Sequence, residues 1–163
     1  MLQVLNDFWL KITYPSGSYK ALKALKNDQD LQALLYVQYA CHPGGGGVTF
    51  WCQCFDDTCT IDYHKTYGKR KLEPEFIKRT ISVELYHQLF EELKQNNLLD
   101  LKTKHASGIR DGIVYSIIFA DRDNIKSLTV GNPHHLPDTP HQMLVDILRD
   151  FIQTKIYFPI INN

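Results

Sequence analysis

The segment VTFWCQCFDDTCTIDYH, residues 48–64, predicts a β hairpin. Runs of β-branched and aromatic residues lie on either side of Asp56-Asp57, which supplies the turn. A two-residue turn at that place makes Cys54 face Cys59 across the hairpin. Because short hairpins join antiparallel strands, this segment points to an antiparallel sheet.

Hydrophobic periodicity and helix caps predict the other elements. We expect further strands at residues 8–14, 112–120 and 125–130. We expect helices at residues 19–40, with a break near residues 27–28, at residues 82–96, and from Thr139 onward.

The connections have their own signals. His42-Pro43 and the four glycines after it predict a loop, and the polar, basic residues 65–79 predict another. Thr139, Pro140 and Gln142 match a helix cap followed by a capping box. The apolar residues 156–161 are expected to pack against the protein or to bind a partner.

These elements predict an α+β fold with two layers, in which helices pack on one face of a mainly antiparallel sheet. The chain of 163 residues suits one domain, residues 1–163, with a single core. We find no internal repeat and no linker that would divide it.

The charge balance bears on the class of partner. Eighteen basic and eighteen acidic residues cancel, which argues against a dedicated nucleic-acid-binding protein. The first residues lack the basic start and apolar run of a secretory signal, and no apolar stretch approaches the ~20 residues that span a bilayer. We therefore expect a cytoplasmic protein that does not contact membranes, with cysteines that are mostly reduced.

The cysteines are the first candidate site. Cys52 and Cys54 lie two residues apart on one strand, so they share a face, and Cys59 joins them if the hairpin turn is correct. Cys41, or the adjacent His42, is a candidate fourth ligand. The spacing lacks the paired C-x2-C of recognisable zinc sites, so buried free thiols are favoured. A zinc site or thiol-dependent enzyme at residues 41–59, and a disulfide, remain alternatives.

Other catalytic signals are missing from the sequence. There is no G-x-S-x-G, and the four glycines precede a predicted strand without the Lys-Ser/Thr of a phosphate-binding loop. We therefore predict no enzymatic activity, no cofactor and no small-molecule substrate.

Basic and aromatic residues alternate after the first hairpin. Such surfaces bind proteins, and they also bind single-stranded nucleic acid, which remains a further alternative. The residues predicted to contact a partner are Tyr63, Lys65, Tyr67, Lys69, Arg70 and Lys71.

Residues 81–101 and 111–152 carry a family resemblance. They hold an Ile-Ser-x-Glu-Leu helix, a strand that begins with Asp-Gly, and a last helix capped by Pro140. This arrangement resembles small bacterial α+β immunity proteins of contact-dependent and secreted toxin systems. The resemblance implies a cytoplasmic, non-enzymatic inhibitor that binds and neutralises one cognate toxin domain.

Overall fold

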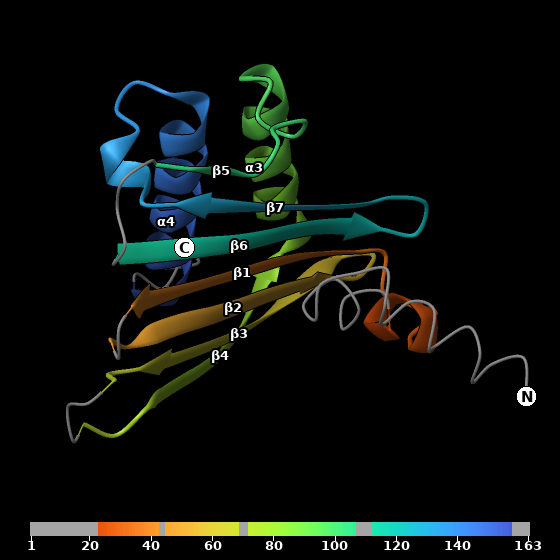
Figure 1. Cartoon of the computed structure of the whole chain (residues 1–163). Coiled ribbons are helices and arrows are strands. Elements are labelled where there is room, and N and C mark those ends of the chain that lie inside the picture. The colour runs from red at the N-terminus through yellow and green to blue at the C-terminus, as the bar shows by residue number, and fades with distance from the viewer. Residues whose placement is uncertain (1–22, 43–44, 69–71, 107–111, 158–163) are drawn as a thin grey trace, which may run out of the picture.

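The computed structural model describes residues 23–42, 45–68, 72–106 and 112–157. Their strands form one sheet of seven in the order β4-β3-β2-β1-β6-β7-β5 (Figure 1). Neighbouring strands are antiparallel except β5, which runs parallel to β7, so the sheet is mixed. The strands are β1 (Ala33–His42), β2 (Gly47–Cys54), β3 (Thr58–Thr66), β4 (Glu75–Ser82), β5 (Lys104–His105), β6 (Gly112–Asp121) and β7 (Ile125–Gly131).

Helices α3 (Val83–Gln95) and α4 (Pro140–Tyr157) pack on one face of this sheet, and the short 3-10 helix η1 (Pro133–His135) precedes α4. Residues 23–27 are helical and pack on the opposite face. The α+β class is thus confirmed. The expectation of helices on one face alone holds for α3 and α4 and is not confirmed for the whole sheet.

Strand β1 corrects the expected helix at residues 19–40. Only residues 23–27 of that stretch are helical among those described, and β1 occupies the centre of the sheet. Leu34 and Tyr36 are buried on one face of β1, and Leu35 and Val37 on the other. A strand buried on both faces has a nearly continuous apolar run, which also satisfies helical spacing over a few residues.

Strand β4 corrects the expected loop at residues 65–79. The loop is shorter, because β3 continues to Thr66 and β4 begins at Glu75. Ile77 and Ile81 face the core side, while Lys78 is exposed. Among the described strands, β4 is an edge strand of the sheet. Edge strands commonly carry charged residues, so their sequence resembles that of a loop.

Both predicted hairpins are confirmed. Cys54 lies opposite Cys59 in the β2–β3 hairpin, and β6 and β7 form the second hairpin. At the start of α4 the Gln142 N–H donates to Thr139 Oγ1 at 3.3 Å. The reciprocal bond of the capping box is replaced, because the Gln142 side chain donates to Asp146 Oδ2 at 2.7 Å. The expected strand at residues 8–14 and most of the apolar tail lie outside the described residues.

Asn132 joins the start of β6 to the end of β7. Its backbone is left-handed, with φ of 51°, and its side chain is buried. The Ile113 N–H donates to Asn132 Oδ1 at 2.9 Å, and the Asn132 N–H donates to the Ile113 carbonyl at 2.7 Å. A Cβ on Gly112 would lie 1.6 Å from Asn132 Oδ1, so the contact requires glycine there.

We expect Asn132→Ala to lower the free energy of unfolding by about 2–3 kcal/mol, because it strains a left-handed residue and leaves the Ile113 N–H unpaired. Asn97→Ala is the matched control, since Asn97 is also left-handed (φ 55°) but exposed. It should cost only about 1 kcal/mol. Urea denaturation measures both, and equal losses would show that the side-chain bond contributes nothing.

Candidate functional sites

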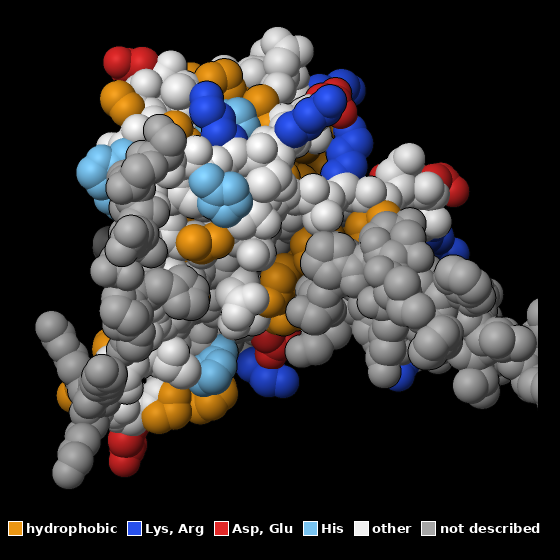
Figure 2. All heavy atoms as spheres, viewed as in Figure 1, with side chains coloured by type: hydrophobic (Ala, Val, Ile, Leu, Met, Phe, Trp, Pro, Cys, Tyr) orange, Lys and Arg blue, Asp and Glu red, His pale blue; other side chains and the backbone are white. Residues whose placement is uncertain are grey.

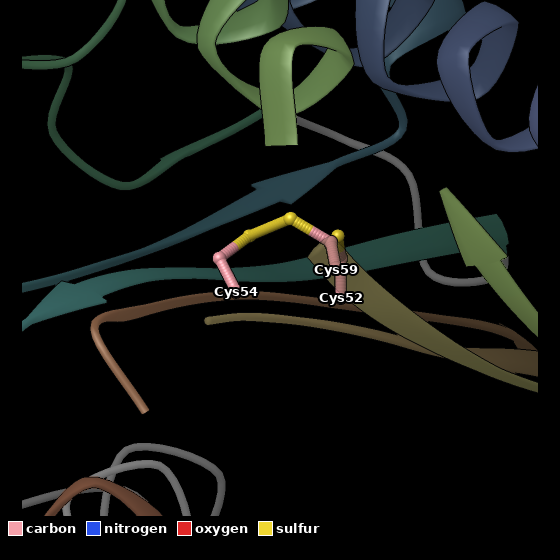
Figure 3. A group of neighbouring side chains, drawn as sticks. All are labelled: Cys52, Cys54 and Cys59. Atoms are coloured by element: carbon pink, nitrogen blue, oxygen red, sulfur yellow. A yellow bond between two sulfur atoms is a disulfide. The ribbon is translucent and has the colours of Figure 1, made fainter. Parts of the chain in front are cut away.

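Three cysteines meet on the face of the sheet that α3 and α4 cover. Cys54 and Cys59 form a disulfide across the β2–β3 hairpin, with 4.1 Å between their Cα atoms, and Cys52 lies beside them (Figure 3). The prediction of buried free thiols is therefore wrong for this pair and holds for Cys52, whereas Cys41 is free but only partly buried. The sulfur atoms of the three clustered cysteines lie within 4.8 Å of one another, and their side chains are at most 2% exposed.

Cys41 does not join this cluster. In the strand register Leu35 pairs with Cys52, so Cys41 lies six positions further along β1. At ~3.3 Å per residue this separation is about 20 Å. The His42 backbone is one position more distant, opposite Gly112. The predicted four-ligand set is therefore not assembled, because Cys41 and His42 belong to the other end of the sheet.

The cluster is dry and poorly suited to acid–base chemistry. Burial raises the pKa of the Cys52 thiol to about 12, so this thiol is not a nucleophile at neutral pH. Tyr86 of α3 packs against the same core, and its hydroxyl is buried without a hydrogen-bond partner. Burial raises the pKa of Tyr86, and electrostatic interaction with Cys52 and then Asp121 raises it further.

A cavity of about 460 Å³ borders this region between α3 and the β6–β7 hairpin. Its walls include Ala33, which pairs with Cys54 in the sheet, and Tyr86. Phe90 and Phe119 add apolar surface. The volume is within the range of small-ligand sites. No local pattern in the sequence indicates this cavity, because its walls come from α3, β1, β6 and β7.

The structure describes three of the six predicted partner-binding residues, and it places Tyr63 and Lys65 on the face of β3 that α4 covers. Tyr63 is buried in the core, and with Lys65 it lines a small cavity of about 110 Å³ beside α4. The Lys65 ammonium lies 4.8 Å from the centre of the Tyr67 ring. The Tyr67 hydroxyl donates to Glu75 Oε2 at 3.3 Å. Lys69, Arg70 and Lys71 lie outside the described residues.

The opposite face of the same hairpin holds an exposed aromatic residue that is not among the six predicted contact residues. Phe76 is 69% exposed and stacks on His64, with 4.2 Å between ring centres. Leu72 is 55% exposed. Figure 2 shows hydrophobic side chains at the surface over this hairpin, beside a histidine. The signal in the sequence was the alternation along β4, in which Phe76 shares the polar side of the strand with Lys78.

The charges on this face are partly neutralised. Lys78 forms an ion pair with Asp62 at 3.2 Å between Nζ and Oδ1. Among the described residues, Phe76 therefore lies beside a paired charge.

Comparison with known proteins adds no assignment. No protein-family model matches this sequence, and no curated protein matches it. Within the described residues, every helix is too short or too polar to span a lipid bilayer. The functional argument therefore rests on the geometry of the cysteine cluster and of the β3–β4 hairpin.

Replacing Tyr86 tests whether its hydroxyl is unpaired. Tyr86→Phe should raise the free energy of unfolding by about 1 kcal/mol, because it removes a buried donor that has no acceptor. Tyr36→Phe is the control, since the Tyr36 hydroxyl donates to Gln38 Oε1 at 2.8 Å. That variant should lose about 1 kcal/mol. Losses of similar size in both variants, measured by urea denaturation, would contradict the unpaired state of Tyr86.

The raised pKa of Cys52 predicts a loss of stability in alkali. In the unfolded chain the thiol releases its proton near its ordinary pKa of 9.0, whereas in the folded chain it does so near 12. Between these values the unfolded state binds fewer protons, so the free energy of unfolding falls by at most about 1.4 kcal/mol per pH unit. This contribution is fully present below pH 9.0.

Cys52→Ala should therefore flatten the decline between pH 9 and about 10, before tyrosines titrate in the unfolded chain. The comparison uses the slopes of unfolding free energy against pH in urea, with the disulfide intact. Identical slopes for the variant and the unmodified protein would show that the Cys52 thiol is not protected by burial.

Proposed function

We propose that this chain is a cytoplasmic, non-enzymatic immunity-type protein that binds and neutralises a cognate bacterial toxin domain. The observation that carries the proposal is the exposed surface of the β3–β4 hairpin. Phe76 and Leu72 are two of the three large hydrophobic side chains that stand out as exposed among the described residues. Large exposed apolar side chains beside paired charges favour a protein partner.

The surroundings of Phe76 suit it for the role of an anchor. Its ring is held by stacking on His64, so little side-chain entropy is lost when a partner covers it. Lys78 and Asp62 lie on the same face and provide a polar rim. In interfaces a central aromatic residue with a polar surround commonly carries most of the binding energy.

The position of β4 adds a second means of recognition. Among the described strands β4 has a neighbour on one side only, β3, and it extends over eight residues. An extended segment of a partner can add to such an edge through backbone hydrogen bonds. Within this proposal the sheet with α3 and α4 is the two-layer scaffold that holds the hairpin.

The first test is whether the gene directly upstream encodes a secreted toxin, and the decisive experiment is co-purification with the C-terminal domain of that toxin. We expect a stable complex and loss of toxin activity when the two are mixed. Phe76→Ala should weaken binding about 30-fold, as for an interface anchor worth about 2 kcal/mol. Calorimetric or surface-based titration of the purified partners gives this ratio.

Met143→Ala is the matched control, because Met143 is 47% exposed on α4, away from the hairpin. It should bind the toxin domain as tightly as the unmodified protein does. Failure of the two proteins to form a complex would overturn the proposed function. Equal weakening by both substitutions would place the interface elsewhere. Binding only to single-stranded nucleic acid, with a steep loss in salt, would favour that alternative class.

A further inference from the structure

The cluster of Cys52, Cys54 and Cys59 has a geometry beyond that of a simple disulfide. Two of the cysteines are alternate residues of β2 and the third is the cross-strand partner of Cys54. The three sulfur atoms therefore point to one place beneath α3. A hairpin disulfide requires only two cysteines, and the third sulfur is left without a bonding partner.

The spacing suits one metal ion bound by three thiolates. With a metal–sulfur distance of about 2.3 Å, three sulfurs in a plane around the ion lie about 4 Å apart. The observed limit of 4.8 Å among the three sulfurs requires only small side-chain movements once the Cys54–Cys59 bond is open. All three cysteines come from one hairpin, so the strands themselves set their positions.

We propose that, with the Cys54–Cys59 bond reduced, Cys52, Cys54 and Cys59 bind one Cu(I) ion. Soft thiolate ligands favour Cu(I) among biological cations, and Cu(I) is stable with three of them. Structural zinc sites use four ligands, and Cys41 is too distant to be the fourth. Exclusion of water also protects Cu(I) from oxidation, and these three side chains are at most 2% exposed.

Tyr86 of α3 belongs to the same hydrophobic core as the three cysteines. Among the described residues, its hydroxyl is buried without a hydrogen-bond partner. A metal-bound thiolate carries negative charge and accepts hydrogen bonds. Metal binding would therefore offer the unpaired Tyr86 hydroxyl an acceptor. The Tyr86 ring also lines the 460 Å³ cavity.

The chemistry balances as follows. A dithiol reductant transfers two electrons and two protons to the Cys54–Cys59 bond, which yields two thiols, and the reductant becomes a cyclic disulfide. Cu(I) then forms three copper–sulfur bonds and displaces the three thiol protons to solvent. Copper keeps its oxidation state throughout the binding step.

The test is an anaerobic titration of the full chain, reduced with a dithiol and freed of the reductant. Cu(I) is supplied from a competing chelator, and thiolate-to-copper charge-transfer absorption reports binding. We expect one Cu(I) per chain in the unmodified protein and in Cys41→Ala. Cys52→Ala, Cys54→Ala and Cys59→Ala should each lose the tight site. The oxidised protein should not bind until it is reduced.

Tyr86→Phe distinguishes a role in metal binding from a structural role. It stabilises the metal-free protein if the hydroxyl is unpaired, yet it should weaken Cu(I) binding about 10-fold by removing the donor to the thiolate. Circular dichroism checks that every variant is folded, and the stoichiometry of the unmodified protein does not depend on any variant.

Three outcomes would overturn the inference: no stoichiometric Cu(I) in the reduced protein, retention of the tight site in folded Cys52→Ala, or preference for Zn(II) over Cu(I). None of them bears on the proposed toxin binding, because the Phe76 surface lies on the opposite face of the sheet from the sulfurs.

Discussion

Burial of β1 on both of its faces is the constraint on which the rest of the structure depends. Leu35 and Val37 belong to the large core beneath α3 and α4, and Leu34 and Tyr36 belong to the smaller cluster on the other face. Strands β2 and β6 use both hydrogen-bonding edges of β1, so its backbone is satisfied within the sheet. The neighbouring strand β6 is also buried on both faces, through Ile117 and Phe119 on one side and Ile118 and Ala120 on the other.

The β2–β3 hairpin brings three cysteines together, and the register of β1 against β2 keeps Cys41 away from them. Ala33 pairs with Cys54 on one side and Asp121 on the other, which places the sulfur cluster, Tyr86 and the larger cavity at one end of the sheet. The same register carries Cys41 to the opposite end. A shift of β2 by a single residue relative to β1 would turn the clustered sulfurs to the other face of the sheet, because side chains alternate along a strand.

The alternation of side chains along β3 also places the two candidate sites on opposite faces of the sheet. Along β3, Cys59 and Tyr63 face the covered core, whereas His64 faces away from it and stacks on the exposed Phe76. One hairpin strand thus contributes to a dry site that is suited to a soft cation and to an open surface that is suited to a protein. The two proposals rest on different faces and on different physical properties, namely soft ligation inside and apolar exposure outside.

Local signals in the sequence determined the two hairpins, α3, the start of α4 at Thr139 and the pairing of Cys54 with Cys59, because each depends on residues close together in the chain. Only the tertiary structure decided that residues 33–42 form a strand, that β4 exists, and that Cys41 is remote. Those outcomes depend on pairing between distant segments and on which faces become covered. A short apolar run does not indicate which segments will pack against it. An exposed phenylalanine or a tyrosine hydroxyl does not indicate its neighbours either.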